Sequence, residues 1–261
     1  MKRIRNNYHT HCDLCHHAQG NIEAYVLQAI KNGFTAIGIS DHAPFDFLED
    51  RSVRMSMSDY PEYKRQLKQS IVHYLDYILI YRSLEIEYFY GLNAHYEQLS
   101  KSLDYLILGQ HYIQVNDQFV STYHIKTSAE LKQYKDTVIQ AMHTGYFKIL
   151  AHPEIFLLHQ AVFTDEIIKL CKEIITAAKD TNTLLELNAN GFRKRKQTVD
   201  GQTFRIYPRK KFWQLVKALD AKTIISADAH HPNQLMDEAM VEAYQFAKDL
   251  SIEVEEELVL D

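Results

Sequence analysis

The stretch Ala36–His42 has the sequence AIGISDH, in which a short apolar run ends in a carboxylate and a histidine. The run AIGIS is typical of a strand that is buried on both faces of a parallel sheet. A helix is predicted before it, because Asn21 is a favourable N-cap, apolar residues recur at helical spacing after it, and Gly33 is a helix stop. With a strand predicted at Asn7–His9, this part of the chain has the order strand, helix, strand, which is typical of parallel α/β sheets.

The same alternation continues along the rest of the chain. Further strands are predicted at Arg82–Tyr88, Tyr105–Gly109, Lys148–Ala151, Thr183–Asn188 and Thr223–Ser226. Helices are predicted at Tyr60–Tyr77, Leu92–Lys101, Ser128–Thr144, Asp165–Lys179, Arg209–Asp220 and Asn233–Lys248. Strands that nearly all lead into helices predict an α/β fold whose parallel sheet is covered on both faces, and we expect a single domain over residues 1–261.

The composition is that of a globular protein, with 261 residues, 46% of them hydrophobic and 24% charged. A formal charge of −5 gives no general reason to expect a nucleic-acid or membrane partner. No window approaches the roughly 18 apolar residues of a membrane helix, and the three cysteines, Cys12, Cys15 and Cys171, do not form a disulfide framework. We therefore expect a soluble cytoplasmic protein; the sequence indicates no oligomeric state.

The positions of the 14 histidines are the main evidence for function. A histidine or a carboxylate stands at or near the C-terminal end of every predicted strand. In a parallel barrel these ends meet at one mouth, where the active sites of such folds lie. One such histidine is more often a packed or surface residue, but the whole series is hard to explain by packing. The series therefore favours a barrel over an open sheet. The candidate metal ligands are His9, His11, His17, His42, Glu85, His111, His152, Asp228 and His230.

Imidazole and carboxylate groups are ligands for Zn²⁺, Mn²⁺ or Fe²⁺. A catalytic zinc takes about three protein ligands and keeps one open position, so this set predicts two or three clustered metals with a bridging carboxylate. Spacing leaves Glu85 and Glu87 open as the bridge, because both point to the same face of a strand. Asp41 points the other way from its neighbouring ligand, and we expect it to orient ligands rather than to bind metal.

The remaining histidines and the cysteine pair have simpler interpretations. We expect no ligand role for His16 and His231, which are neighbours of ligands, or for the histidines on predicted helices and loops, namely His73, His95, His124, His143 and His159. Cys12 and Cys15 form a CxxC that could be a zinc knuckle or a redox pair, but the sequence has no second CxxC.

The motifs HTH (9–11) with His17, SDH (40–42), LEIE (84–87), GQH (109–111), AHP (151–153) and SADAH (226–230) resemble the polymerase-and-histidinol-phosphatase (PHP) family. They run from Tyr8 to His231 in the family's order. Within the family the resemblance is to histidinol-phosphate phosphatases of histidine biosynthesis, through residues 17–45, 54–63, 84–88 and 186–194 and Tyr207-Pro208. The resemblance implies a distorted (β/α)7 barrel with three divalent metal ions at the C-terminal ends of its strands.

The resemblance also implies how the ligands are shared and which glutamate is the bridge. It assigns His9, His11, Glu85 and Asp228 to the first metal, Glu85, His111 and His152 to the second, and His17, His42 and His230 to the third. The sequence departs from the family at Ser83, where relatives usually have glycine, and in a longer and more basic loop over residues 191–207.

A metal cluster at a barrel mouth suits phosphate-monoester hydrolysis, because metals generate a bridging hydroxide near neutral pH and neutralise phosphate oxygens. No CxxxxxR loop or DxDx motif offers a covalent nucleophile, so the metal-bound hydroxide is the only catalytic group that we predict. Arg193 is the first candidate for a phosphate clamp and Arg54 the second, while Glu87 is a candidate partner for a substrate nitrogen.

The resemblance therefore implies hydrolysis of L-histidinol phosphate to L-histidinol and phosphate. The alternatives are a protein-tyrosine phosphatase, an exonuclease or another phosphoesterase with the same site, and a metal-binding module without activity. The negative net charge weighs against nucleic acid.

Overall fold

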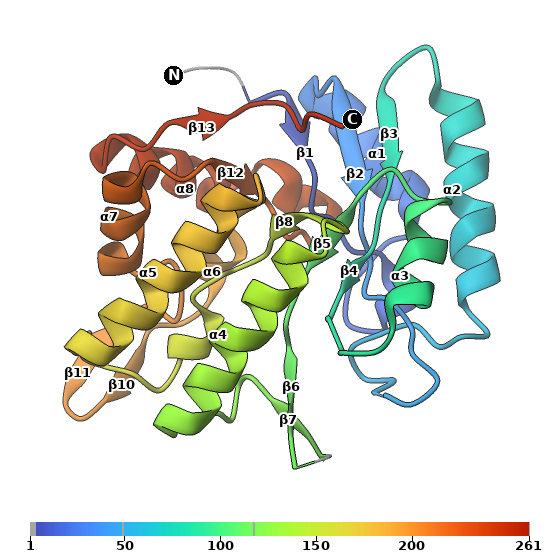
Figure 1. Cartoon of the computed structure of the whole chain (residues 1–261). Coiled ribbons are helices and arrows are strands. Elements are labelled where there is room, and N and C mark those ends of the chain that lie inside the picture. The colour runs from blue at the N-terminus through green and yellow to red at the C-terminus, as the bar shows by residue number, and fades with distance from the viewer. Residues whose placement is uncertain (1–3, 49, 117, 261) are drawn as a thin grey trace.

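The fold is built on a ring of short parallel strands, shown in Figure 1 as a computed structural model that describes residues 4–48, 50–116 and 118–260. One sheet has the order β1-β2-β3 and the other the order β13-β12-β9-β8-β5-β4. Parallel bridges between Thr10 and Ala229 and between His42 and Glu85 join the two sheets on both sides. The strands are β1 (Asn6–Asn7), β2 (Ala36–Ile39), β3 (Leu79–Arg82), β4 (Glu85–Ile86), β5 (Leu106–Leu108), β8 (Phe147–Leu150), β9 (Leu184–Asn188), β12 (Thr223–Ser226) and β13 (Val254–Glu255).

The predicted distorted (β/α)7 barrel is confirmed. Strands β3 and β4 are successive parts of one segment, so the ring has seven positions in chain order, each parallel to the one before. The barrel is distorted where it closes. The N-terminal end of β12 pairs with β13, through Thr223 and Val254. Beyond the C-terminal end of β12, Ala229 instead bridges directly to Thr10, which follows β1.

Helices follow most strands and cover the outside of the ring (Figure 1). They are α1 (Ile22–Asn32), α2 (Tyr60–Tyr74), α3 (Asn93–Ser100), α4 (Ser128–His143), α5 (Asp165–Asp180), α6 (Asn190–Arg193), α7 (Lys210–Leu219) and α8 (Glu238–Asp249). The predicted ends of α1 are confirmed, because the Asn21 side chain accepts a hydrogen bond from the Ala24 N–H and Gly33 adopts a φ of 75°. Among the described residues, no helix has both the length and the apolar character needed to cross a membrane.

A small apolar cluster, separate from the main core, forms a floor inside the barrel. It contains Tyr8, Tyr105, Ile107, Ile149, Ala151, Leu184, Ile224 and Leu258. Side chains alternate along a strand, so residues two positions further on point into the same interior. Leu184 is thus followed by Glu186, and Ile224 by Ser226 and then by Asp228. The polar residues therefore stand above an apolar floor, toward the C-terminal ends of the strands.

Two sequence predictions of regular structure need correction. The helix predicted over Asn233–Lys248 is interrupted, because the short 3-10 helix η3 (Pro232–Met236) ends before Asp237, whose side chain caps α8 by accepting from the Met240 N–H. The strand predicted at Arg82–Tyr88 begins earlier, with β3 at Leu79. Both errors come from giving apolar spacing more weight than local capping and pairing.

Two antiparallel hairpins, which were not predicted from the sequence, follow β5 and β9. They are β6 (Tyr112–Val115) with β7 (Gln118–Ser121), and β10 (Gln197–Val199) with β11 (Gln202–Phe204). The second hairpin turns at Asp200-Gly201, where both residues have positive φ, and Asp-Gly is a known signal for such a turn. Both hairpins lie at the end of the molecule opposite the chain termini (Figure 1).

Candidate metal centre

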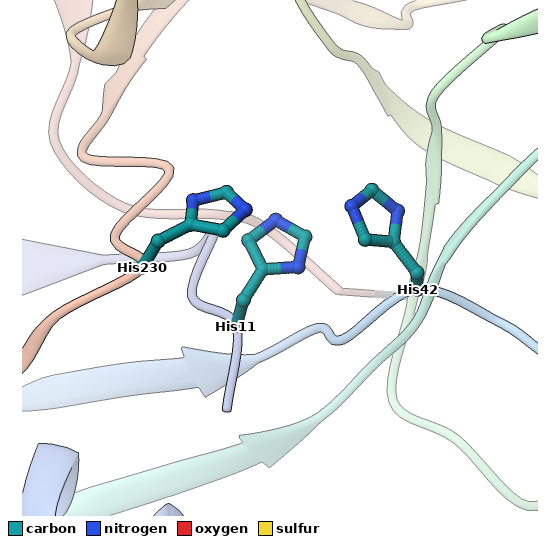
Figure 2. Close-up of side chains that lie close together, drawn as sticks. All are labelled: His11, His42 and His230. Carbon is teal, nitrogen blue, oxygen red and sulfur yellow. The ribbon is translucent and has the colours of Figure 1, made fainter. Parts of the chain in front are cut away.

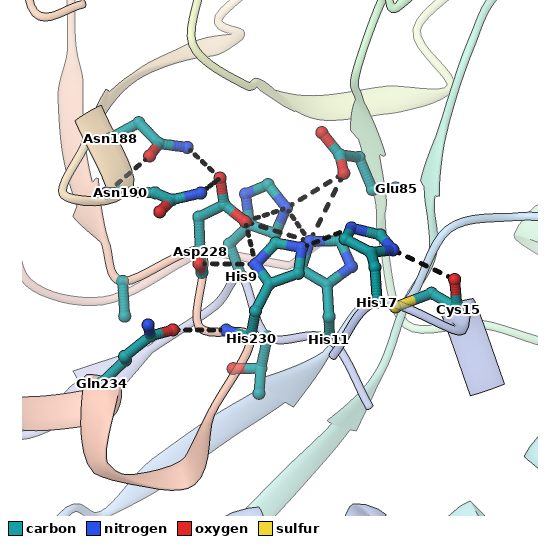
Figure 3. Close-up of polar contacts among 12 residues, drawn as sticks. His9, His11, Cys15, His17, Glu85, Asn188, Asn190, Asp228, His230 and Gln234 are labelled. Carbon is teal, nitrogen blue, oxygen red and sulfur yellow. Dashed lines mark hydrogen bonds and ion pairs between the residues drawn. The ribbon is translucent and has the colours of Figure 1, made fainter. Parts of the chain in front are cut away.

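The nine predicted ligands converge at the C-terminal ends of the strands. Seven of them line a cavity of about 570 Å³, and the other two, His9 and His11, are fully buried directly behind it. His9 and His11 alternate with Thr10 on an extended segment, so both imidazoles point to the same side. Their Nε2 atoms are 3.0 Å apart, and the Nε2 of His11 lies 3.1 Å from Oδ1 of Asp228 (Figure 3).

Glu85 lies at the centre of the set and faces two groups of histidines. Its Oε2 is 3.3 Å from His9 Nε2 and 3.1 Å from His42 Nδ1, whereas its Oε1 is 3.0 Å from His152 Nε2 and 3.5 Å from His111 Nε2. A carboxylate with one oxygen toward each group has the geometry of a bridging ligand. Of the two glutamates that spacing left open, Glu85 is the one placed to bridge.

Gly109 at the end of β5 leaves the space that Glu85 occupies. A Cβ atom at this position would lie 2.2 Å from Oε1 of Glu85 and 2.4 Å from its Cγ, so a side chain cannot be accommodated without displacing the carboxylate. The glycine of the motif GQH is therefore required by packing against Glu85.

A third group of imidazoles stands on the other side of His11. The Nε2 atoms of His17 and His230 are 2.9 Å apart, and His11, His42 and His230 bring one ring nitrogen each within 4.8 Å of one another (Figure 2). His42 also approaches Glu85 and His111 within the same limit. It therefore stands between the third group, to which the resemblance assigned it, and the group around Glu85.

Most of the histidines are held by a hydrogen bond at Nδ1, which leaves Nε2 directed at the centre. Glu186 accepts from His9 at 2.8 Å, and Asp41 accepts from His11 at 3.3 Å. Orienting contacts of this kind are typical of metal-binding histidines. The expected orienting role of Asp41 agrees with this contact. Glu186 lies in β9, near its C-terminal end, but its role in orienting His9 was not predicted from the sequence.

The electrostatics of the centre favour bound cations. Burial raises the pKa values of Glu85 and Asp228, but neighbouring imidazoles, above all His9, outweigh it and hold both well below the usual range. Burial lowers the pKa of His42, and it lowers that of His230 to about 3, so these imidazoles are neutral and can bind metal. Around His9 burial is outweighed by Glu186 and Glu85, which raise its pKa, so positive charge is attracted there.

Two further observations show that these residues fit metal ions. Oδ1 of Asp228 and Nδ1 of His152 are buried and make no hydrogen bond within the described structure, which is costly unless another partner binds them. The same two residues have positive φ values, 45° and 30°, a strained backbone for residues other than glycine. Strain at the ends of β8 and β12 is typical of a site that the fold holds in place for a ligand.

Comparisons with known proteins agree with this geometry. The model of the PHP domain family matches residues 7–190. The chain belongs to the PHP domain family. Curated relatives named "Probable histidinol-phosphatase" come from Schizosaccharomyces pombe, 24% identical over 87% of this chain and 81% of the relative, and from Deinococcus radiodurans, 23% identical over 87% and 86%.

A solved structure also shares the fold of this PHP-domain chain. The histidinol phosphate phosphatase of Lactococcus lactis, in a complex with zinc, L-histidinol and phosphate, superposes with a TM-score of 0.70 at 20% identity, covering 96% of this chain and 95% of its own.

Arg193, the first predicted phosphate clamp, has other partners in the structure, so its contact with phosphate stays a prediction. Its guanidinium donates to both carboxylate oxygens of Asp237, at 2.7 and 3.0 Å, and to the carbonyls of Ala227 and Gln234, at 2.6 and 2.8 Å. All three nitrogens are engaged, and Arg193 does not line the cavity. The side chain instead ties α6 to the start of α8 and to the residue before Asp228.

Arg54 and Glu87 form a buried pair beside His111. The two side chains make two hydrogen bonds, at 2.7 and 3.0 Å, and Glu87 also accepts from Nδ1 of His111 at 3.3 Å. Arg54 lines the cavity, so its predicted contact with substrate stays a prediction. Glu87 does not line it, and both of its oxygens accept from Arg54, so its predicted contact with a substrate nitrogen also stays a prediction.

The structure adds cavity residues that the sequence analysis did not propose. Lys194 follows α6 and lines the cavity, and no hydrogen bond or ion pair of its ammonium group is found in the described part of the chain. His124, which we expected to be an ordinary surface or packed residue, also lines it. The remaining additions are Asp50, Val53, Tyr112, Ser121, Tyr123, Asn190 and Tyr207.

The CxxC pair lies beneath the centre as two free, buried thiols. Cys12 Sγ donates to Asp41 at 2.9 Å, and Cys15 Sγ donates to the carbonyl of Cys12 at 3.1 Å. Cys12 thereby supports the aspartate that orients His11. His16 is exposed, and the His231 side chain caps η3 by accepting from the Asn233 N–H.

Proposed function

We propose that this PHP-domain protein is a metal-dependent phosphatase that hydrolyses L-histidinol phosphate to L-histidinol and phosphate. The observation that carries the proposal is Glu85, whose two oxygens face separate groups of histidines at the wall of one cavity. The choice of substrate is supported by the names of the curated relatives and by the product complex of the Lactococcus lactis protein.

We assign three divalent ions, zinc, manganese or iron, to the three groups of ligands. The first would be held by His9, His11, Glu85 and Asp228, the second by Glu85, His111 and His152, and the third by His17, His42 and His230. Divalent ions at such a site supply a nucleophile near neutral pH and neutralise the charge of a phosphate ester. Mixed nitrogen and oxygen ligands accept all three metals.

The chain's own contribution to phosphate binding is assigned to Lys194. Arg54 is neutralised by Glu87 and Arg193 by Asp237, whereas Lys194 has no anionic partner among the described residues. An ammonium group at the cavity wall can neutralise a phosphate oxygen without a rigid geometry. We therefore assign to Lys194 the phosphate contact that the sequence suggested for Arg193.

The test is steady-state kinetics of purified, metal-analysed protein on a panel of phosphomonoesters. We expect kcat/KM for L-histidinol phosphate to exceed that for p-nitrophenyl phosphate by roughly a hundredfold or more, a gap typical of a site built for polar groups of its substrate. Equal values for the two esters would overturn the substrate assignment. Preference for a phosphotyrosine peptide would support the tyrosine phosphatase instead, and inactivity of metal-loaded protein on every ester would support a binding module.

We also propose a cytoplasmic location. It is supported by three cysteines that are all buried and free, a state typical of reducing compartments.

A further inference from the structure

A carboxylate outside the metal centre is held in a fixed position at the cavity wall. The Tyr112 hydroxyl donates to Oδ2 of Asp50 at 2.6 Å, while the Ser52 hydroxyl and backbone N–H donate to Oδ1 at 2.6 and 3.3 Å. These hydrogen bonds, with Ser52 first, hold the pKa of Asp50 below its usual value. The carboxylate is therefore ionised and oriented near neutral pH.

The segment that carries Asp50 is fastened to the hairpin that carries Tyr112. Phe47 stacks on Phe119 of β7 with ring centroids 5.6 Å apart, and Phe89 packs edge-on against Phe119 at 5.0 Å. Asp50 and Tyr112 thus belong to one wall, made from the loop after β2 and from the β6–β7 hairpin. Such support is what a binding group requires, because a fixed side chain loses little entropy when substrate binds.

Asp50 is the acid of the described cavity lining that remains available for a ligand. The other two acids there, Glu85 and Asp228, are surrounded by the imidazoles of the metal centre. Arg54 is nearby, but its guanidinium is bound to both oxygens of Glu87 and makes no ion pair with Asp50 in the described structure.

A series of contacts through other side chains connects Asp50 with Glu85. They run from Glu85 to His111 and Glu87, and then to Arg54, whose guanidinium lies over the ring of Tyr112 at 5.7 Å. Tyr112 in turn reaches Asp50. A substrate with its phosphate at the metal centre would present its opposite end here, and in L-histidinol phosphate that end is the imidazole ring.

We propose that Asp50 accepts a hydrogen bond from the imidazole N–H of the substrate and so selects imidazole-bearing phosphate esters. This inference rests on the proposed function. It assigns to Asp50 the contact with the end of the substrate that is distant from the phosphate. Tyr112 acts as a positioning residue, since its hydroxyl holds the carboxylate. A charged acceptor opposite a ring N–H is a strong and directional contact.

The experiment compares Asp50→Asn with wild-type protein on L-histidinol phosphate and on 2-aminopropyl phosphate, which keeps the ammonium group and lacks the imidazole ring. Loss of one charge-assisted hydrogen bond predicts a KM for L-histidinol phosphate that is higher by roughly tenfold, with kcat changed less than about threefold. For 2-aminopropyl phosphate we expect a change in kcat/KM of less than about twofold. The matched control is Asp46→Asn, an exposed residue of the same loop that does not line the cavity.

A second variant, Tyr112→Phe, keeps the carboxylate and removes one of its supports. We expect the same selective rise in KM, by about threefold, because the carboxylate is less well oriented. If Asp50→Asn affects both esters equally, or neither, the inference is overturned while the proposed function stands. Wild-type protein that does not prefer L-histidinol phosphate to 2-aminopropyl phosphate overturns the inference as well, and absence of turnover of L-histidinol phosphate overturns the proposed function.

Discussion

Replacing Arg193 by alanine separates a structural role from a role in phosphate binding. In the structure its guanidinium joins α6 to Asp237, the N-cap of α8, and donates to the carbonyl of Ala227, directly before Asp228. None of these contacts involves the cavity. We therefore expect Arg193→Ala to destabilise the fold and to leave the KM for the phosphate ester within about threefold of wild type at saturating metal.

The size of the destabilisation follows from what each partner of Arg193 loses. Ala227 is fully buried, so its carbonyl is left without a donor, which costs about 1–3 kcal/mol. The pair with Asp237 is partly exposed, with 29% of the aspartate side chain accessible, and adds about 0.2–1 kcal/mol. The sum is roughly 1–4 kcal/mol, which for a chain of this length lowers Tm by roughly 2–16 °C.

The assay is thermal unfolding of metal-loaded protein, together with the KM for L-histidinol phosphate. Arg195→Ala is the matched control, because Arg195 belongs to the same basic run and is exposed; its Tm should stay within about 1 °C. Lys194→Ala should show the opposite pattern to Arg193→Ala, with a KM raised by about tenfold and an unchanged Tm. An unchanged Tm with a tenfold higher KM in Arg193→Ala would refute our interpretation. Arg193 would then be a residue that binds the phosphate group.

Four further outcomes follow from the metal centre. Gly109→Ala should lower bound metal and kcat by more than about a hundredfold, because its Cβ displaces Glu85; elemental analysis and kinetics measure this, and wild-type values would contradict the packing argument. Glu85→Ala or His152→Ala should abolish turnover with an unchanged circular dichroism spectrum, so full activity in either variant excludes that residue's assignment as a metal ligand. Glu186→Gln should weaken metal binding by about 10–100-fold, as seen by competition with a chelating dye, because the acceptor that orients His9 loses its negative charge. Removing metal with a chelator should lower both activity and Tm, and zinc or manganese should restore them; a Tm indifferent to metal would show that the ions do not bind the native state tightly.

The barrel and the ligand set were predictable because both depend on local signals. The apolar runs that became β2, β9 and β12 lie in the sequence as compact strands, and their C-terminal ends must meet once the strands are parallel. The groups at those ends could therefore be brought together without knowledge of any distance.

The roles of the cationic residues could not be predicted in the same way. Arg193 and Lys194 are adjacent in the sequence. Which of the two forms an ion pair depends on the position of Asp237, 44 residues beyond Arg193. The pairing of Glu87 with Arg54 across 33 residues has the same origin. Such partners are set by tertiary packing, whereas the Asp200-Gly201 turn of the second hairpin was a local signal that the sequence analysis overlooked.

The β6–β7 hairpin has a consequence for how this enzyme could be retargeted. It projects from the loop after β5, contributes Tyr112 and Ser121 to the cavity, and leaves the strands of the barrel untouched. Exchanging this one insertion would alter the shape of the entrance while the ion-binding residues kept their scaffold. New specificities could then be selected by swapping a short ribbon of chain instead of redesigning a catalyst.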